Sequence, residues 1–310
     1  MIMNNNPLVS VIVPNYCHAK YLDQRIESIL AQTYTNYELI ILDDKSSDNS
    51  LEVIMKYQDN PHVSHIVANE ENSGNTFKQW EKGIGLSQGE LIWIAESDDY
   101  CEPNLLQELV SAFFKIKDCS VAYSTSMIVN ETGEFRWTVE KYPNQYIKGT
   151  DYVRRYLALE AFIWNASSAI FSKEKVKKIP TIYQNFKGAG DYMFWTLMSL
   201  QGNIAIVNKQ LNYFRRHDGV VTNTHDADGS NYVANMEILN YMFEHVYFSW
   251  LRKRYVRAYR AYKMTRKTFA NDEIKTKMIN LWEVEKYSSL FDKLLYKIGN
   301  YIHFHYHYYI

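Results

Sequence analysis

The chain has 310 residues, enough for one large domain with a further segment, and its 46% hydrophobic and 22% charged residues are typical of a globular protein with a sizeable core. A net charge of −1 gives no electrostatic case for nucleic acid as a partner. The three cysteines are odd in number and unpatterned, which argues against a disulfide framework and for a reducing compartment. No apolar stretch reaches the ~18 residues that span a bilayer, and Met1–Asn6 is too short and polar for a signal peptide. We therefore predict a protein of the cytoplasm or of the inner face of the membrane.

The first 130 residues alternate between strand and helix patterns. Strands are predicted at 9–13, 37–42, 62–68, 91–95 and 121–129, and helices at 21–31, from the caps at 46–48 to about 57, at 76–82 and at 105–117. Alternation at this spacing predicts a parallel sheet with right-handed crossovers.

The pattern is less regular in the rest of the chain. We expect a loop over a site at 134–149, helices at 152–161 and 191–200, strands at 169–171, 204–207 and 211–214, and only helices from 229 to about 298. The sequence therefore predicts an α/β domain over residues 1–228 and a helical extension over 229–310.

Acidic residues follow two of the predicted strands. Glu96-Ser97-Asp98-Asp99 comes directly after the apolar run 91–95, and Asp43-Asp44 comes after 39–42. Neighbouring carboxylates repel one another unless a cation or hydrogen-bond donors meet them. The carboxyl ends of parallel strands are also where open α/β sheets bind ligands. The pattern predicts a site for a metal-bridged phosphate.

Two shorter segments could take part in such a site. Tyr16 in Pro14-Asn15-Tyr16 can stack on a planar ring, and Asp44 could accept a hydrogen bond from a base. Asn72-Ser73-Gly74-Asn75 offers main-chain N–H groups before a helix. The structural alternative for the first residues is a strand-end turn and a helix N-cap, and for Asn72-Ser73-Gly74-Asn75 it is an isolated glycine turn.

In this order the segments resemble the family 2 inverting glycosyltransferases, which have the nucleotide-sugar-binding fold called GT-A. The resemblance rests on Val9–Tyr16, Leu42–Asp48, Asn72–Gly74 and Glu96–Asp99 with Pro103 following, and it covers roughly residues 7–220. It implies a Rossmann-like, mainly parallel sheet flanked by helices, a divalent cation (Mn²⁺ or Mg²⁺) and a nucleotide-sugar donor, with a UDP-sugar as the default.

The resemblance also implies roles for individual residues. Pro14, Asn15, Tyr16 and Asp44 would bind the nucleoside, Asn72, Gly74 and Lys78 the donor phosphates, and Glu96, Asp98, Asp99 and His217 the metal, with Asp98 foremost. The sequence departs from the family pattern in three places: Glu96 replaces the usual Asp, Lys78-Gln79-Trp80 stands where the family has Ala-Arg-Asn, and Gly190 stands where the first acid of a later acidic pair is expected.

An inverting transfer needs a carboxylate that takes the proton of the acceptor hydroxyl. Relatives place it in an acidic pair that opens a late helix, and Gly190-Asp191 stands there, so Asp191 is the predicted base. Its structural alternative is a helix N-cap. Trp164–Ser168 stands where relatives contact the acceptor, and its structural alternative is packing. Arg215-Arg216-His217 matches a basic segment that closes over the diphosphate in relatives. The structural alternative for His217 is a solvated loop histidine.

The helix predicted at 250–269 carries eight Lys and Arg residues interleaved with tyrosines. It could lie on a membrane surface, which would suit a lipid-linked acceptor, or pack by its tyrosines. The aromatic tail that follows could form a homodimer interface.

We predict a metal-dependent inverting glycosyltransferase that acts on a glycan or lipid-linked acceptor, for a cell-surface polysaccharide. A nucleotidyltransferase would carry a Gly-rich basic loop after the first strand, and a dehydrogenase a G-x-G-x-x-G, and neither is present. A non-catalytic nucleotide-sugar-binding or scaffold subunit is the alternative from another class. Asp44, Asp98 and Asp191 argue against it.

Overall fold

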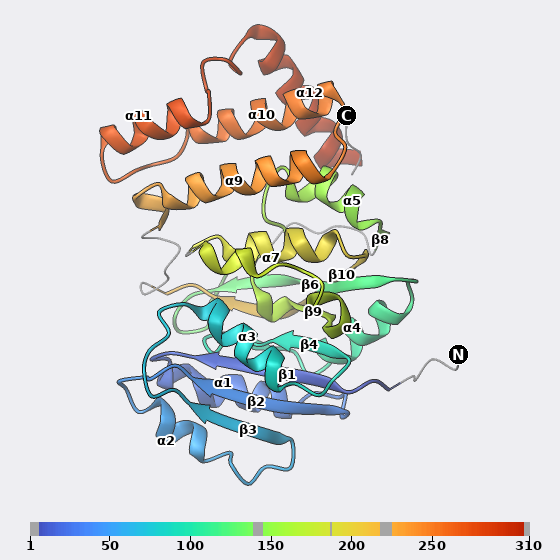
Figure 1. The fold of residues 1–310 in the computed structure, drawn as a ribbon, viewed down its shortest axis with the longest axis vertical. Coiled ribbons are helices and arrows are strands. Elements are labelled where there is room, and N and C mark those ends of the chain that lie inside the picture. Colours follow the sequence, from blue (N-terminus) through green and yellow to red (C-terminus); the bar gives the residue numbers. More distant parts are fainter. Residues whose placement is uncertain (1–5, 139–144, 187, 218–224, 307–310) are drawn as a thin grey trace. The chain divides into compact units, whose positions relative to one another are not determined.

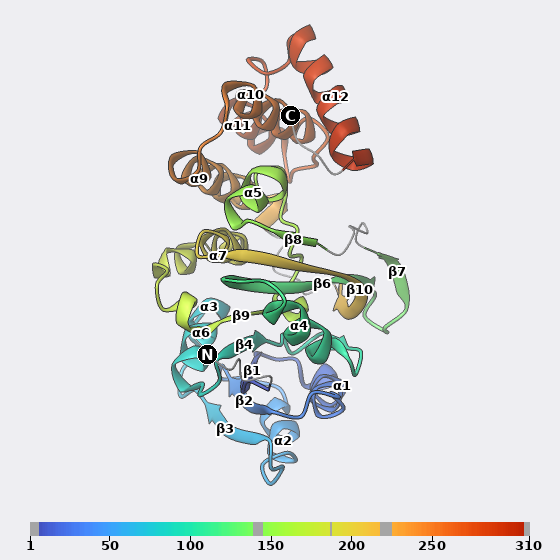
Figure 2. The ribbon, with the colours of Figure 1, turned by 90° about the vertical axis from the view of Figure 1, so that its right-hand side faces the viewer.

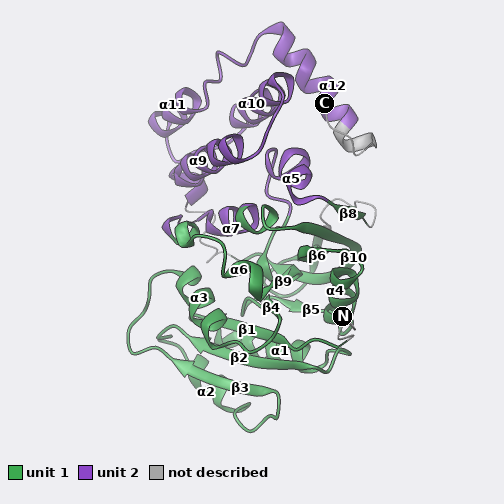
Figure 3. Cartoon of the chain, turned by 45° about the vertical axis from the view of Figure 1, so that its right-hand side comes forward, with its two compact units in different colours: residues 1–147, 163–184, 197–217 green, residues 148–162, 185–196, 218–310 purple. Residues whose placement is uncertain are grey.

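The computed structural model describes residues 6–138, 145–186, 188–217 and 225–306. The chain forms two compact units, shown in Figure 3. Unit 1 comprises 1–147, 163–184 and 197–217, and unit 2 comprises 148–162, 185–196 and 218–310. Unit 2 thus contains two segments from before residue 228, where the sequence predicts a single boundary.

Unit 1 is built on one mixed sheet with the strand order β3-β2-β1-β4-β9-β6-β10-β5, with β7 on β6 and β8 on β10 (Figure 1). The strands are β1 (Val9–Asn15), β2 (Tyr37–Asp43), β3 (Val63–Ala68), β4 (Leu91–Ile94), β5 (Tyr100–Cys101), β6 (Cys119–Val129), β7 (Phe135–Thr138), β8 (Gln145–Ile147), β9 (Ala169–Ser172) and β10 (Asn203–Arg215). The first four strands along the chain are parallel, as predicted, and β9 runs antiparallel between β4 and β6.

Helices cover both faces of this sheet, which is why the central strands are apolar on both sides. In unit 1 they are α1 (Ala19–Leu30), α2 (Ser50–Met55), α3 (Thr76–Leu86), α4 (Leu105–Phe114) and α6 (Lys173–Val176). Helices α1, α2 and α4 share one core with the odd-numbered residues of β1, and α3 lies on the opposite face (Figure 2). A Cβ on Gly83 of α3 would lie 2.4 Å from the Cγ2 atom of Ile12, so α3 approaches β1 closely.

The structure departs from the sequence prediction at three places in unit 1. Pro14 lies inside β1 and pairs with Leu42, so the strand continues to Asn15 instead of ending before the proline. The predicted loop 134–149 contains β7 and β8, while 139–144 lies outside the described residues. The two strands predicted between 204 and 214 are the single bulged strand β10.

Unit 2 is helical. Its helices are α5 (Gly149–Tyr152), which continues as a π-helical turn (Val153–Leu157), the first part of α7 (Gly190–Ser199), α9 (Ser230–His245), α10 (Trp250–Met264), α11 (Asp272–Leu281) and α12 (Leu290–Tyr306). None of the described helices is long and apolar enough to cross a membrane.

The basic helix predicted at 250–269 is α10, and it is packed inside unit 2. Arg252 is 2% exposed and, like Arg260, donates to main-chain carbonyls within 154–158. Arg254 forms a bidentate pair with Asp292 of α12 at 2.7 and 2.8 Å. These three arginines therefore serve contacts within unit 2, with the buried tyrosines of the helix. Lys253, Lys263, Arg266 and Lys267 of the same segment are exposed, and the membrane contact that the sequence suggested for it stays a prediction.

Candidate active site

Strands β1, β2 and β4 are parallel neighbours, so their carboxyl ends meet at one edge of the sheet of unit 1. The chain turns sharply after β1, where Cys17 has a φ of 55° and its N–H donates to Ser46 Oγ at 2.8 Å. This turn aims His18 at the loop that follows β4, where its Nδ1 lies 2.8 Å from Ser97 Oγ. The acidic segment predicted from the sequence thus lies beside the end of the first strand.

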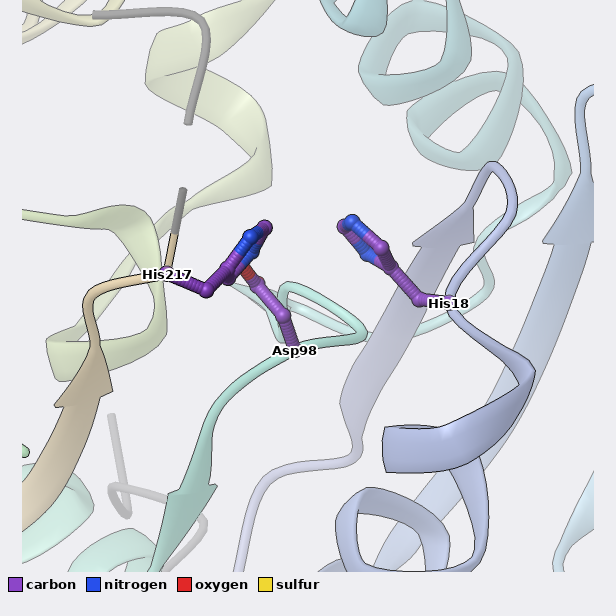
Figure 4. A group of neighbouring side chains, drawn as sticks. All are labelled: His18, Asp98 and His217. Carbon is purple, nitrogen blue, oxygen red and sulfur yellow. The ribbon is translucent and has the colours of Figure 1, made fainter. Parts of the chain in front are cut away.

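Three side chains converge at this edge: His18 from the start of α1, Asp98 from the loop after β4, and His217 just beyond β10 (Figure 4). One potential ligand atom from each lies within 4.8 Å of the other two. His217 Nε2 is 3.2 Å from Asp98 Oδ2, and the imidazoles of His18 and His217 meet edge to face with centroids 5.6 Å apart.

The surroundings of His18 and Asp98 favour the protonation states that bind metals. Burial lowers the pKa of His18, so its imidazole is neutral at neutral pH and offers a nitrogen lone pair. Burial also acts to raise the pKa of Asp98, but the hydrogen bond from His217 and the electrostatic influence of the two nearby histidines outweigh it and hold that pKa below its ordinary value. Asp98 is therefore an anion between two histidines.

This set of donors fits a divalent cation. Two imidazole nitrogens and one carboxylate oxygen suit Mn²⁺ and other transition ions better than Mg²⁺, which prefers oxygen ligands. The contact between Ser97 and Nδ1 of His18 leaves Nε2 for a metal, the arrangement by which outer groups orient histidine ligands.

The two other predicted metal ligands, Glu96 and Asp99, do not belong to this group. Glu96 accepts a hydrogen bond from the Trp80 indole at 2.9 Å, and burial together with the nearby Asp98 raises its pKa to about 8. Asp99 is 1% exposed and points into the protein, where burial and Asp98 raise its pKa to about 7. Of the acidic segment, only Asp98 joins the histidines.

Asp99 serves the loop's architecture. Its Oδ2 accepts from Asn165 Nδ2 at 2.5 Å and from Ser167 Oγ at 2.6 Å, and its Oδ1 accepts from the main chain of Arg215 at 2.9 Å. The segment 164–168, considered from the sequence as an acceptor contact or as packing, therefore provides two donors that hold the acidic loop in place.

Arg215 has a similar supporting role and is 2% exposed. Its guanidinium donates to the main-chain carbonyl of Asp98 at 2.8 Å and to Gln24 Oε1 at 2.6 Å, and it lies between the rings of Tyr21 and Tyr100. These contacts occupy the side chain of Arg215, the first residue of the segment that the resemblance places over the donor diphosphate. Arg215 thus fixes the position of Asp98 and, through its own main chain, the start of the segment that carries His217.

A second buried cation lies within the core of unit 1. Arg25 of α1 is fully buried, with its guanidinium 5.2 Å from the Trp93 ring centroid. Its charge acts to lower the pKa of both Glu96 and Asp99. No sequence motif marked Arg25, because arginine is a residue type that is mostly exposed, even though Arg25 stands at the core-facing spacing of α1.

Asp44 is 5% exposed and its carboxylate is already hydrogen-bonded within the protein. Its Oδ1 accepts from Asn69 at 2.6 Å and from Gln79 at 2.9 Å, and its Oδ2 accepts from Ser73 Oγ at 2.7 Å. Asn72 donates to its main-chain carbonyl at 2.8 Å. Asp44 therefore holds the turn before α3, and only Oδ2, with one bonded donor, has capacity left for a further one.

The other residues predicted to bind the donor differ in exposure. Tyr16 is 51% exposed, whereas Pro14 and Asn15 are buried, with Asn15 donating to Asp43 at 2.8 Å. Gly74 is exposed with a φ of +67°, a conformation that favours glycine, and Lys78 is exposed with its Nζ 3.2 Å from the carbonyl of Ser73. Tyr16, Gly74 and Lys78 are accessible to a ligand, while Pro14 and Asn15 shape the strand end.

Asp191 lies in the first turn of α7, in the part that belongs to unit 2. Its Oδ1 accepts from the N–H of Tyr192 at 2.8 Å. Burial raises the pKa of its carboxyl group to about 6, so the group is ionised at neutral pH and can take up a proton.

The sequence-based prediction missed His18, Ser97 and the supporting roles of Asn165, Ser167 and Arg215. His18 carried one usable signal: it stands three residues after the last buried position of a strand, next to a predicted ligand-binding edge. The supporting residues carried none, because their partners are more than 60 residues away along the chain.

The model of glycosyl transferase family 2 matches residues 10–179, which is more than half of the chain. The chain belongs to this family. Among curated proteins, this family 2 chain is 29% identical over 281 residues to the glycosyltransferase GlyG of Streptococcus pneumoniae serotype 4, covering 83% of this chain and 88% of GlyG. It is 29% identical over 130 residues to the putative teichuronic acid biosynthesis glycosyltransferase TuaG of Bacillus subtilis, covering 42% of this chain and 51% of TuaG.

Among solved structures, the family 2 chain is similar to S. aureus TarS 1–349 in complex with UDP-GlcNAc. The TM-score is 0.64 at 17% identity, and the match covers 95% of this chain and 80% of TarS 1–349. At this identity the likeness concerns the fold, and it agrees with the GT-A fold that the sequence motifs predict.

Proposed function

We propose that this family 2 glycosyltransferase transfers a sugar from a nucleotide-diphosphate sugar to a hydroxyl group of a glycan or lipid-linked acceptor, with inversion at the anomeric carbon and with the help of a divalent cation. The observation that carries the proposal is the convergence of His18, Asp98 and His217 at the carboxyl ends of β1 and β4. Ligands of open α/β sheets bind at this edge.

We assign the cation to Asp98, His217 and His18, and Mn²⁺ fits this donor set better than Mg²⁺. The bound cation would neutralise the negative charge that develops on the departing nucleoside diphosphate. Arg215 and Asp99 hold the loop that carries Asp98, so the carboxylate is positioned before any ligand arrives.

The donor nucleoside would stack on the exposed ring of Tyr16, and its base could donate a hydrogen bond to Oδ2 of Asp44. The accessible turn with Gly74 and the exposed ammonium of Lys78 would meet the phosphates. The complexes of TarS contain UDP and UDP-GlcNAc, which supports a UDP-sugar as the donor.

For the transfer itself, the carboxylate of Asp191 would accept the proton of the attacking hydroxyl. A pKa of about 6, raised by burial, leaves this group ionised at neutral pH and more basic than an ordinary aspartate. Attack opposite to the leaving group then inverts the anomeric configuration, as in other one-step transfers.

The acceptor class is proposed from the relatives. TuaG is named for teichuronic acid biosynthesis, which supports a role in making a cell-surface polysaccharide. A lipid-linked acceptor would bring the enzyme to the surface of a membrane, and a homodimer remains a further proposal for the C-terminal helices.

A thermal-shift screen of UDP, GDP, dTDP and CDP, each with Mn²⁺, Mg²⁺ or EDTA, tests the donor site. Binding only to the folded state should add about 2.7 kcal/mol of stability at a hundredfold excess over Kd. We expect one nucleotide to stabilise the protein with Mn²⁺ but not with EDTA, and Asp98→Ala to abolish that shift. Asp59→Ala, an exposed carboxylate on the loop before β3, is the control that should retain it. A shift that is independent of metal would contradict the cation site, and the absence of any shift would contradict the donor site.

A further inference from the structure

Helix α12 of unit 2 exposes a row of large apolar side chains. Leu290, Phe291, Leu294 and Ile298 are 46% to 86% exposed, although a helix in a globular protein normally turns such residues toward a core. At about 100° per residue, these four positions fall within an arc of about 100° on one side of the helix.

The opposite side of α12 is the one that packs. Asp292, Leu295 and Gly299 are buried, and a Cβ on Gly299 would lie 2.3 Å from the ring of Tyr255 in α10. The helix therefore already has its contact with unit 2, and the exposed row is a second apolar face on the same helix.

Aromatic and basic residues border this row. Trp250 of α10 is 68% exposed and stacks on Phe291, with ring centroids 6.4 Å apart. Lys293 and Lys297 are exposed along the other edge, and neither has an acidic partner among the described residues. We name Trp250, Leu290, Phe291, Leu294 and Ile298, with Lys293 and Lys297 at their edge, the α12 face.

The charge of the chain is concentrated in the same region. Residues 246–310 contain 13 Lys and Arg and five Asp and Glu, a net charge of +8, whereas the whole chain carries −1. The first 245 residues thus carry −9. An electrostatic difference of this size directs the C-terminal helices toward anionic surfaces and the rest of the chain away from them.

We propose that the α12 face binds an anionic lipid surface. An exposed apolar arc with lysines at its edge and a tryptophan beside it has the composition of a helix that lies in the membrane interface, where lysines extend to the headgroups. Charge favours lipid over a second copy of this chain. Pairing two α12 faces would bring their lysines together, and the acidic residue of α12 near them, Asp292, is buried and bonded to Arg254.

Vesicle flotation tests the proposal, comparing phosphatidylcholine vesicles with vesicles that also contain phosphatidylglycerol. We expect binding to the anionic vesicles, weakened by salt, and little binding to the neutral ones. The double variant Leu294→Glu/Ile298→Glu should lower the binding by about tenfold or more. Lys293→Gln and Lys297→Gln should each lower it by about fivefold.

The matched control is Thr276→Glu/Asn280→Glu, which adds the same two negative charges at exposed positions of α11. Its vesicle binding should fall only by the effect of the added charge and stay above that of Leu294→Glu/Ile298→Glu. Thermal unfolding of each variant reports whether it folds, and nucleotide binding is measured separately, so failure of this proposal is distinct from failure of the proposed transfer. Equal binding by the Leu294→Glu/Ile298→Glu and control variants would overturn the proposal. The proposal would also be overturned if the parent bound no vesicles but formed a dimer that the Leu294→Glu/Ile298→Glu variant dissociates.

Discussion

At the residue scale, two neighbouring carboxylates of the same loop have different roles. Asp98 faces His18 and His217, while Asp99 faces inward and accepts hydrogen bonds from Ser167 and from the main chain of Arg215. The inward carboxylate fixes the loop, and the outward one is left for a ligand. This division explains how neighbouring carboxyl groups can be stable side by side: donors and a raised pKa accommodate Asp99, and a cation can meet the charge of Asp98.

His18 should contribute to metal affinity and not to binding of the nucleoside. We predict that His18→Ala raises the Mn²⁺ concentration needed for half-maximal activity by at least about tenfold, because it removes one of three ligands. A Mn²⁺ titration of UDP release at saturating donor measures this. His65→Ala, on β3, is the control and should leave the titration unchanged. An unchanged Mn²⁺ requirement in His18→Ala would remove His18 from the cation site.

Asp191 should set the acidic limb of the pH profile. Because burial raises its pKa to about 6 and the base must be ionised, we predict that kcat at saturating Mn²⁺ rises with pH, with the midpoint of the rise near pH 6. The His18→Ala variant, assayed at saturating Mn²⁺, should show the same limb. If the His18→Ala substitution shifted the midpoint of the acidic limb, the titrating group would belong to the metal site and not be Asp191.

The same pKa shift has a consequence for stability. A carboxyl whose pKa is raised in the folded protein favours folding at low pH, and this contribution is lost as the pH rises through about 6. Asp191→Asn should therefore be at least as stable as the parent at pH 8. Loss of turnover in that variant cannot then be attributed to unfolding.

The residues of the site were predictable to different degrees. Asp98 could be found because it follows a buried strand in a parallel sheet, where ligand sites occur. The inward direction of Asp99 and the internal use of Arg215 could not, since they depend on contacts between segments more than 60 residues apart along the chain. Asp44 shows the same limit, because its carboxylate serves the turn before α3.

At the scale of elements, the parallel half of the sheet was predicted well. Strands β1, β2 and β4 are apolar on both faces, and such runs stand out in a sequence. The antiparallel insertion of β9 between β4 and β6 was not predicted, because no local pattern specifies which strands pair. Pro14 was misjudged as a strand end, although it lies within β1 and pairs with Leu42 of β2.

The packing of α3 offers a matched pair of glycines. At Gly83 a Cβ would lie 2.4 Å from Ile12, whereas at Gly85 on the same helix it would meet nothing within 4 Å. We predict that Gly83→Ala destabilises the protein, since an overpacking cost of about 1–3 kcal/mol exceeds the gain in helix propensity. Gly85→Ala should stabilise it by about 0.5–1 kcal/mol.

Urea unfolding followed by circular dichroism measures both free energies of unfolding. Because the two substitutions add the same methyl group to one helix, their difference reports the contact between α3 and β1 alone. Equal effects would mean that α3 does not approach the sheet as closely as the structure has it.

At the scale of the whole molecule, the chain joins an α/β unit that carries the cation cluster to a helical unit that carries Asp191 and the α12 face. The helical C-terminal region and the α/β class followed from periodicity. The division of the chain did not, because unit 2 takes in 148–162 and 185–196, which lie between strands of unit 1 along the sequence. Local periodicity cannot reveal which segments share a core.

Turnover by Asp191→Asn tests the proposed transfer. The thermal-shift screen identifies the nucleoside diphosphate, and turnover is measured as its release from the corresponding nucleotide sugar, with water or an acceptor glycan supplying the hydroxyl. We predict that the variant keeps the Mn²⁺-dependent thermal shift of the parent and loses turnover by about 100- to 10,000-fold, the range typical of a missing general base. Turnover within a fewfold of the parent would contradict the assignment of Asp191 as the base, since the chain would then transfer sugar without that carboxylate.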